Sequence, residues 1–441
     1  MMPTGGGYAI NRFRKEVYQS FEKRGDAALD LIDGLSGAER VGSPVDVSES
    51  PLFRRKFSSV YDLLENGKLA ADRIRRALYR NQPTSGERIA GYEIHVVDAT
   101  DAPHPDAETL EDRTQSKKGR HAPKVVGHRY SWLVRVLSQR PSWCMPEDVE
   151  RIESDETDSA IAAKQVKALD KQGANRKVVV ADSLYSNYVF LVAFLVVTTV
   201  VALVRLRSNR VLYEEPPEPA EKQKGRPCKH GDKFKLRDPH RPPDRTEATT
   251  VLGQAVRLSA WHDLHFYRLP ALVGLVLMVE FLKADGTPRF QRPLYLFWTG
   301  PQTIALADLC QMYLWRFAIE HMFRFLKQHM GLNTCRSPEP ECHELWVWCC
   351  ALAHAQLGLI RDEVAQHRPP WHKQCDEQGQ PRKLTARQTQ RNALPFLLEL
   401  GTPASAPRPA GKGPGRTLGY SPTPRQRHPV IKKGKKQPKS A

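Results

Sequence analysis

The sequence predicts an α/β protein in which helices cover a sheet. Three observations predict this class. Short runs rich in β-branched residues recur along the chain, stretches with helical periodicity lie between them, and hydrophobic residues make up 40% of the 441 positions. Strands interleaved with helices are typical of a sheet with covered faces. The composition supports a large core and excludes collagen-like, wholly disordered and small disulfide-stapled classes.

The first 90 residues or so are predicted to be helical and are mixed in charge. Residues 60–64 (VYDLL) and 74–78 (IRRAL) have the spacing of amphipathic helices. Two interpretations stay open for this N-terminal region. It is either a small DNA-binding or dimerising module, or a subdomain that only packs against the rest.

Strands are predicted from Gly91 onward. Residues 92–97 form a β-rich run that ends at Asp98, and residues 125–137 hold a second and a possible third strand. Residues 177–181 (KVVVA) form a buried strand that ends at Asp182. The apolar run 189–204 is shorter than the roughly 20 residues that span a bilayer, so it is interpreted as a buried helix followed by a buried strand.

The composition changes between about residues 207 and 292, which predicts an insertion. Within it, residues 222–245 hold nine Lys/Arg and three Asp, a net charge of +6. Residues 294–298 (LYLFW) again predict a strand, and long helices are expected over about 304–330 and 344–363. From Gly401 the chain is rich in Pro and Gly and has no carboxylates, so 91–400 is predicted as the main domain and 401–441 as a disordered basic tail.

The chain is strongly basic, with 67 Lys/Arg, 49 Asp/Glu and a formal charge of +18. Nucleic acid is the commonest acidic partner of such chains, although ribosomal and membrane-surface proteins share the same balance. The eight cysteines form no CxxC pair and no secretory segment starts the chain. A reducing cytoplasm is therefore the expected location, with no membrane partner.

The segment around Glu320 is the most informative part of the sequence. On one continuous helix, Tyr313, Arg316, Glu320, Arg324 and Lys327 fall within about 80° of one another, and apolar residues occupy the opposite face. The alternative interpretation is an ordinary helix face exposed to solvent. In that case the alignment of five polar groups directly after a buried strand would be a coincidence.

Two further acids follow predicted strands. Asp98 and Asp182 come at strand ends, where open α/β sheets carry their functional groups. Either one alone is more often a turn former or a helix cap. Together with Glu320 they could bind two Mg²⁺ ions, which prefer carboxylate oxygens and can activate a water or a 3′-hydroxyl for attack on a phosphodiester.

These residues resemble a known family. Tyr313-x2-Arg316-x3-Glu320-x6-Lys327 matches without a gap the C-terminal signature of DDE transposases of the insertion-sequence-four type. Residues 98–100 (DAT) and 181–186 (ADSLYS) resemble the first and second Asp motifs of that family. The resemblance covers roughly residues 91–360. It implies an RNase H-like mixed sheet flanked by helices, with a largely β insertion before the last catalytic helix.

The resemblance also implies roles for individual residues. Asp98, Asp182 and Glu320 would be the catalytic residues and the ligands of two Mg²⁺ or Mn²⁺ ions. Asp101 is a rival to Asp98 as the first ligand, although Asp98 directly ends the apolar run. DNA phosphates would contact the cationic and tyrosine side chains of the helical stripe: Tyr313, Arg316, Arg324 and Lys327.

The family stacks an aromatic side chain on a base flipped out at the cleavage site. Trp261 and Trp298 are the candidates, and Trp298 is better explained as a core residue of its strand. Two interpretations stay open for the basic stretch of the insertion, a DNA-backbone contact and a solvated loop. Its candidate DNA-binding residues are Lys229, Lys233 and Lys235.

The expected function is that of a transposase. It would cleave DNA strands at the terminal inverted repeats of an insertion sequence, in a metal-dependent reaction, and would join the ends to target DNA. A homodimer is expected because two ends must be brought together, and a bacterial, nucleoid-associated location follows. The alternatives are a domesticated or defective copy that binds DNA without transposing, and a basic structural protein of the nucleoid with no chemistry.

Overall fold

A computed structural model describes residues 5–83, 86–117, 123–138, 143–217, 228–366, 383–409 and 423–432, with residues 375, 379, 415 and 417–421. Four helices open the described chain, α1 Gly5–Ser20, α2 Gly25–Gly37, α3 Ser58–Asn66 and α4 Ala71–Arg80, with the short strands β1 Phe21–Lys23 and β2 Lys68–Leu69 between them. Strand β3 Arg88–Ile89 then leads into a mixed sheet.

The central part of this sheet consists of five strands in the order β7-β6-β4-β8-β9. Their bounds are β4 Tyr92–Pro103, β6 Lys124–Ser138, β7 Trp143–Arg151, β8 Lys177–Ala181 and β9 Val200–Leu206. Strands β4, β6 and β7 pair antiparallel in chain order, whereas β8 and β9 run parallel to β4. This mixed sheet, flanked by helices, confirms the predicted RNase H-like fold class.

The insertion is largely β, as predicted, and it extends the same sheet beyond β9. Strand β15 pairs with β9, and β14, β13 and β10 follow in that order toward the edge strand β11. The bounds are β10 Val211–Tyr213, β11 Lys233–Lys235, β12 Arg245–Val251, β13 Gln254–Phe266, β14 Leu269–Phe281 and β15 Leu294–Trp298. At the opposite edge, β5 Thr114–Lys117 pairs with β6.

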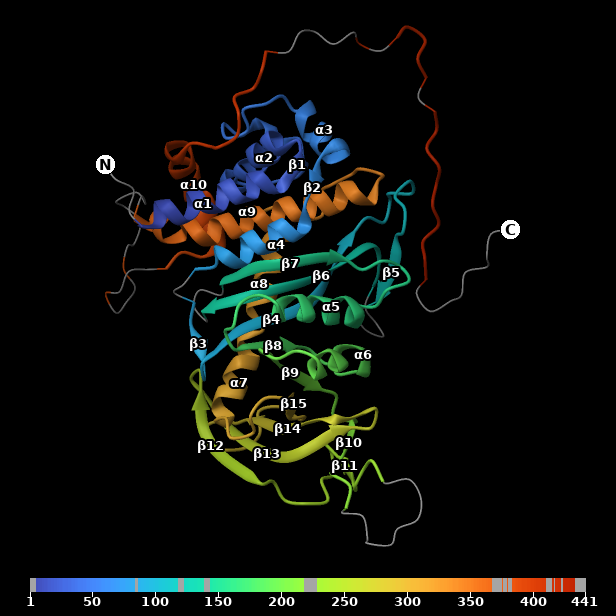
Figure 1. The fold of residues 1–441 in the computed structure, drawn as a ribbon, viewed down its shortest axis with the longest axis vertical. Coiled ribbons are helices and arrows are strands. Elements are labelled where there is room, and N and C mark those ends of the chain that lie inside the picture. The colour runs from blue at the N-terminus through green and yellow to red at the C-terminus, as the bar shows by residue number, and fades with distance from the viewer. Residues whose placement is uncertain are drawn as a thin grey trace.

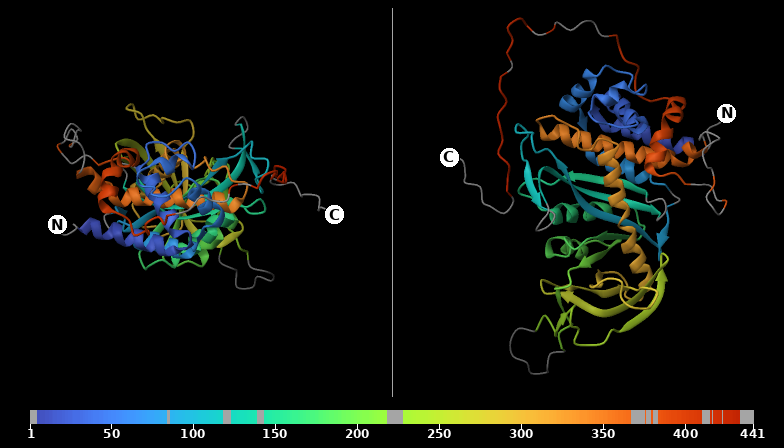
Figure 2. Two further views of the ribbon diagram at one scale, coloured as in Figure 1. Left: turned by 90° about the horizontal axis from the view of Figure 1, so that it is seen from above. Right: turned by 180° about the vertical axis from the view of Figure 1, so that it is seen from behind.

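Helices cover both faces of the central strands. Helix α5 Asp158–Asp170, α6 Tyr188–Leu191 and the 3-10 turn Val192–Leu195 lie on one face, and α7 Leu306–Trp315, α8 Ala318–Gln328 and α9 Pro340–Gln366 lie on the other (Figures 1 and 2). Successive side chains along a strand point to opposite faces of the sheet, so each strand contributes to the hydrophobic cores on both faces. In β8, Val178 and Val180 belong to the α7–α9 side, and Val179 and Ala181 belong to the α5–α6 side.

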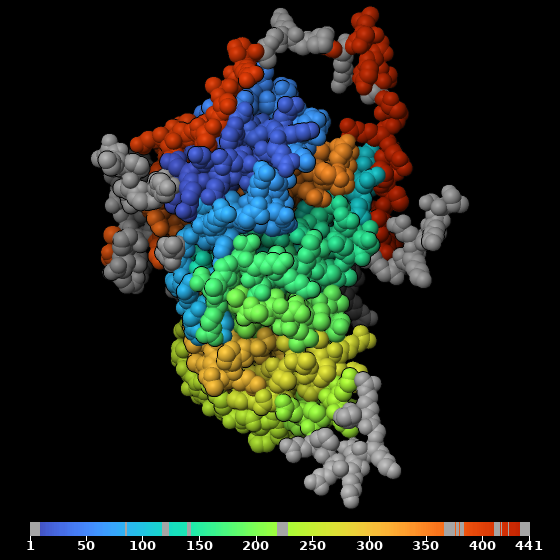
Figure 3. Space-filling view, viewed as in Figure 1, coloured from blue at the N-terminus to red at the C-terminus, as the bar shows by residue number. Residues whose placement is uncertain are grey.

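The N-terminal helices pack against the C-terminal ones. Helices α1, α2 and α3 contact α9, and α10 Ala386–Leu400 contacts α2 and α9. A buried ion pair joins Arg14 to Asp33, and Gln356 of α9 donates to the same carboxylate at 2.9 Å. These helices and the insertion occupy opposite ends of an elongated molecule (Figure 3). The structure thus shows a packing role for this region, while DNA binding by it stays a prediction.

The apolar run 189–204 is a short helix followed by the buried strand β9, as predicted, but the helical part is only half buried. Phe190 and Leu191 lie in the core, whereas Val189, Leu195 and Val196 are exposed. Among the residues that the structure describes, no helix has the length and apolar character needed to cross a membrane.

Three elements differ from the prediction. The expected helix 304–330 is two helices, because residues 316–317 form a tight turn in which Arg316 N–H bonds Tyr313 O and Phe317 N–H bonds Leu314 O. Such i→i−3 bonds change the rotation per residue, so the five polar groups do not form one straight stripe.

Asp98 lies inside β4 and does not follow it, because the antiparallel pairing of β4 with β6 continues as far as Pro103 of β4. The parallel partner β8 pairs with β4 only as far as Val96, so Asp98 lies just beyond the end of that pairing.

Part of the tail that was predicted to be disordered contacts the sheet. Residues 425–432 contact the β5 edge of the sheet through several hydrogen bonds and ion pairs. Helix α10, which no pattern predicted, begins at a Thr385 capping box with Gln388.

Candidate active site

The three acids of the sequence prediction line one cavity of about 790 Å³. The cavity opens where β4 extends past β8, between these strands and α8. Its other charged lining groups are Asp158, Arg129, Arg207, Arg324 and Lys327. Strand β5 supplies the rim residues Thr114, Gln115 and Ser116.

Asp98 projects from β4 toward the α7–α8 face of the sheet. One carboxylate oxygen accepts the Ala99 N–H at 2.8 Å, and the other lies 3.6 Å from Arg316 Nη1. Burial, together with the charge of Asp182, raises the pKa of Asp98 to about 6 despite that arginine. The ionised form of Asp98 is therefore destabilised by burial and by the neighbouring Asp182 carboxylate.

Asp182 directly follows β8, as the sequence predicted. Its Oδ1 accepts the Leu184 N–H at 2.7 Å, which closes a tight turn after the strand. Tyr185, fully buried below this turn, packs against Phe190 of α6 at a ring distance of 5.3 Å. The turn is thus anchored from below while the Asp182 carboxylate stays half-buried at the cavity.

Glu320 lies in the first turn of α8, where the helix dipole favours a carboxylate. Its Oε1 accepts from Arg316 Nη2 at 3.0 Å, so Arg316 bridges Glu320 and Asp98. In the described conformation Arg316 is therefore engaged with the acids, whereas the sequence placed it on DNA phosphates.

Asp101, the rival first ligand, is turned away from the cavity. It is 5% exposed and pairs with Arg129 at 2.7 Å, and Arg129 also pairs with Asp158. Lys327 donates to the Asp101 backbone carbonyl at 2.6 Å. These contacts hold the second half of β4 against α5 and α8, and they leave Asp98 as the acid of this strand in the cavity.

The remaining predicted DNA contacts divide into exposed and buried side chains. Arg324 is exposed at the cavity, and Lys229, Lys233 and Lys235 are exposed beside or on the edge strand β11.

Two aromatic candidates are buried. Tyr313 is 7% exposed within the core of α7, with Arg316 over its ring at 5.7 Å. Trp261 is 3% exposed, packs on Phe234 and donates to Arg241 O at 3.2 Å. In this conformation neither Tyr313 nor Trp261 is presented to DNA, since both complete hydrophobic cores. Trp298 is fully buried, in agreement with a core role.

The cavity carboxylates fit a divalent cation. Burial and the charge of Asp182 disfavour the ionised form of Asp98, and a bound cation would offset both effects. The three acids do not bring an oxygen each within 4.8 Å of one another. Two ions about 3.5–4 Å apart would not require this, because the outer carboxylates then bind different ions.

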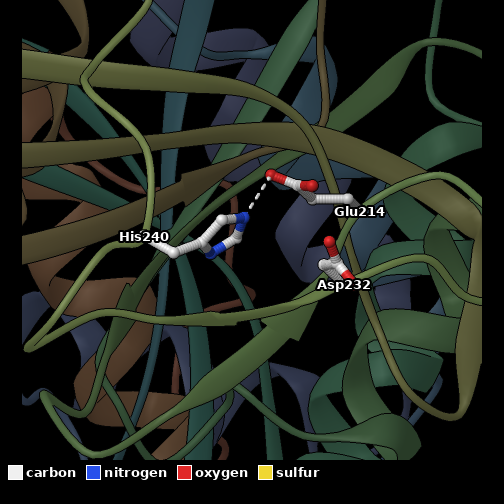
Figure 4. A group of neighbouring side chains, drawn as sticks. All are labelled: Glu214, Asp232 and His240. Carbon is white, nitrogen blue, oxygen red and sulfur yellow. Dashed lines mark ion pairs between the residues drawn. The ribbon is translucent and has the colours of Figure 1, made fainter.

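A second group of ligand-type side chains lies in the insertion. Glu214, Asp232 and His240 bring one ligand atom each within 4.8 Å, and among the described residues no other set of three His, Cys, Asp or Glu does so (Figure 4). Asp232 and His240 are exposed. Glu214 already accepts from Arg241 at 2.7 Å and lies 3.3 Å from His240 Nε2. An ion here would have to displace an arginine from a solvated carboxylate.

Several lining residues were not predicted. Arg207 follows β9 directly, so the strand-end rule that found Asp182 could have found it as well. Asp158 begins α5 after the Thr157 cap and resembles any helix-start acid in the sequence. The β5 rim has no sequence signal, because its place depends on pairing with β6.

Comparison with known proteins gives one family. A family model described as "DDE superfamily endonuclease" matches residues 16–265, more than half of the chain. The match includes Asp98 and Asp182 and ends before Glu320. None of the curated proteins matches the chain.

One solved structure, the C-terminal lobe of a budding yeast Argonaute, aligns at 9% identity with a TM-score of 0.23. The alignment covers 79% of this chain and 62% of the Argonaute chain. Its TM-score is too low for any structural argument.

Proposed function

The chain belongs to the DDE superfamily endonucleases, and from this premise we propose that it is a transposase acting at the terminal inverted repeats of an insertion sequence. The observation that carries the proposal is the convergence of Asp98, Asp182 and Glu320 on one cavity, in which burial and the charge of Asp182 raise the pKa of Asp98. Perturbed carboxylates in a cleft mark functional sites.

Asp98, Asp182 and Glu320 would hold two Mg²⁺ or Mn²⁺ ions. When bound, the ions would activate the attacking water or 3′-hydroxyl and stabilise the leaving oxygen of the phosphodiester. The protein positions these acids with two buried strands and one helix start. Arg316 holds Asp98 and Glu320 on the same side of the cavity.

The exposed cations of the cavity would bind the DNA backbone. Arg207 and Arg324 are exposed at the rim, where an arginine fork can bind phosphate with two hydrogen bonds. Strand transfer would follow from a second use of the same acids, with a DNA 3′-hydroxyl in place of water. Two protomers would be needed to hold two transposon ends together.

The test uses a duplex that carries the terminal sequences flanking the gene, with Mg²⁺ or Mn²⁺. Wild-type protein should cleave at the repeat boundary. Glu320→Gln should lose cleavage and keep DNA binding in a mobility-shift assay, because the change removes one negative charge from an otherwise intact surface. Equal cleavage by Glu320→Gln would refute the site. DNA binding by wild-type protein without cleavage under any metal would favour the domesticated copy.

A further inference from the structure

Helix α8 separates the carboxylate cavity from a second cavity, which has a volume of about 350 Å³ and is bounded on its far side by the start of α10. Glu320 and Lys327 line the carboxylate cavity from one face of α8, and His321 and Gln328 line the second cavity from the next face. Arg324 lies between these faces and lines both cavities. We call the second cavity the α8–α10 pocket.

The inner wall of the α8–α10 pocket is apolar except for one histidine. Met322 and Phe325 line it, and the ring of His354 from α9 lies 5.6 Å from the ring of Phe325. His354 is 2% exposed, and its Nε2 lies 2.9 Å from Cys144 O. A carbonyl oxygen only accepts, so Nε2 carries the ring proton and Nδ1 is left as an acceptor.

This acceptor is buried and unsatisfied. Among the described residues, His354 Nδ1 has no hydrogen-bond partner. Burial lowers the pKa of His354 to about 4, so the ring is neutral at pH 7 and Nδ1 keeps its lone pair. A buried acceptor without a partner costs free energy, and a ligand that donates an N–H to Nδ1 would remove that cost.

The outer rim of the pocket is cationic. His329 and Arg387 line it, and no Asp or Glu of the described chain does so. Burial lowers the pKa of His329, and the charges of three nearby arginines lower it further: Arg387, Arg391 and Arg40. Burial and the charge of Arg391 lower the pKa of Arg387 as well, although the charge of Glu39 acts in the opposite direction. An anion at this rim would reduce the repulsion among the arginines.

An apolar wall with one buried acceptor and a cationic rim suits a nucleotide, because a base is flat and carries N–H donors and a phosphate is an anion. The volume also lies in the range of small-molecule sites. We propose that the α8–α10 pocket binds one nucleotide, with a base N–H at His354 Nδ1 and the phosphate at Arg387.

The nucleotide has two possible sources, a DNA strand that enters the carboxylate cavity and a free mononucleotide. Arg324 favours the strand, because an arginine that borders both cavities can hold the phosphate between them. The strand as the source rests on the proposed function, whereas the nucleotide pocket itself does not.

The pocket is tested by calorimetric titration of the full chain in EDTA with 2′-deoxyadenosine 5′-monophosphate (dAMP). An analogue with hydrogen in place of the 6-amino group should bind about tenfold more weakly, because it leaves His354 Nδ1 without a donor. Inorganic phosphate should bind more weakly than either, since it leaves the apolar wall uncovered. Absence of dAMP binding would overturn the pocket, and equal affinities of dAMP and the analogue would overturn the base contact.

Variants of the pocket locate the bound dAMP. Ala386 is half-buried at the start of α10 and lines the pocket, so Ala386→Trp should fill it and weaken dAMP binding at least about tenfold. Arg387→Gln should weaken binding about fivefold and reduce its dependence on salt. Arg268→Gln, an exposed arginine of the insertion, is the control and should bind like wild type.

Wild-type affinity for dAMP in both pocket variants would overturn the proposal. If Ala386→Trp does not fold, Arg387→Gln decides alone, because it changes a side chain at the rim.

The source is tested with the terminal duplex and chains that carry Glu320→Gln to prevent cleavage. If a nucleotide of the DNA strand occupies the pocket, saturating duplex should abolish dAMP binding, and Ala386→Trp should weaken duplex binding about fivefold. If the pocket takes a free nucleotide, duplex and dAMP should bind independently of one another.

The two proposals can fail separately. If wild type does not cleave the duplex but dAMP binding depends on Ala386 and Arg387, the pocket stands and the transposase proposal fails. If cleavage depends on Glu320 and dAMP does not bind, the pocket proposal alone fails.

Discussion

The carboxylate cavity and the Glu214–Asp232–His240 group both gather potential metal ligands, and they differ in what neutralises them. In the cavity, the nearest cation to Asp98 is 3.6 Å away and the pKa of the acid rises to about 6 through burial and Asp182. In the insertion, Glu214 has Arg241 at 2.7 Å and its two companions are exposed to water.

We expect the metal ions at the cavity acids, because these side chains are held on rigid elements, although the ligand atoms of the insertion group lie closer together. The insertion group meets the distance criterion and the cavity acids do not. The cavity acids, however, lie on two buried strands and at a helix start, and Asp98 is buried beside the charge of Asp182.

The largest expected effect is on the rate of DNA cleavage, which should depend on the cavity acids and not on the Glu214–Asp232–His240 group. Asp182→Asn should lower the rate of cleavage of a terminal-repeat duplex at least about 1,000-fold, because a metal-binding carboxylate is lost. Asp232→Asn is the matched control in the insertion group and should stay within about twofold of wild type. The rates are measured as single turnovers on labelled DNA, and a larger loss in Asp232→Asn would reverse the comparison.

A second effect concerns stability without metal. The pKa of Asp98 is raised in the folded state, so its ionisation on going from about pH 4 to above pH 6 costs stability. Asp98→Asn should therefore increase the free energy of unfolding by about 1–3 kcal/mol at pH 7 in EDTA, and by less at pH 4.5. Urea unfolding at both pH values measures this. An equal change in the free energy of unfolding at the two pH values would show that the charge of Asp98 does not destabilise the fold.

A third effect links metal to folding. Mn²⁺ at about 10–30 times its Kd should raise the free energy of unfolding of wild type by roughly 1.4–2 kcal/mol. Asp98→Asn should abolish this increase, while His240→Ala should retain it. The reverse pattern in urea titrations would place the ion in the insertion.

The smallest expected effect concerns Arg316. Its guanidinium favours the charged form of Asp98, so Arg316→Gln should raise the pKa of Asp98 further. The pH at which Mn²⁺ stabilisation is half lost should then move upward by up to about one unit. Arg324→Gln, an exposed arginine of the same cavity, is the control. An unchanged midpoint in Arg316→Gln would mean that Arg316 does not tune the site.

Continuous apolar runs predicted the central strands and the covered sheet correctly, because a strand with both faces buried must be apolar throughout. Residues 177–181 and 200–206 are strands at the centre of the sheet, and the β insertion lies where the composition changed. The strand-end argument placed Asp182 at the carboxyl end of β8. Its role, like those of Asp98 and Glu320, awaits the cleavage tests.

Helical periodicity was misleading in one place. A single helix over 304–330 aligned Tyr313 with Glu320, but the chain turns at residues 316–317, Tyr313 lies in the core, and Arg316 pairs with Asp98 and Glu320. Spacing cannot reveal such a turn, because each half of the segment keeps a regular helical pattern on its own.

The sequence by itself determined which segments are apolar enough to form strands and which acids stand beside them, since these depend on neighbours along the chain. Only the tertiary structure decided which acid of β4 lines the cavity. Asp98 lies beyond the end of the pairing with β8, whereas Asp101 is held by Arg129. The tertiary structure also decided that residues 425–432 return to β5, more than 300 residues away along the chain. Such contacts depend on burial and on cross-chain hydrogen bonds, which local sequence patterns do not encode.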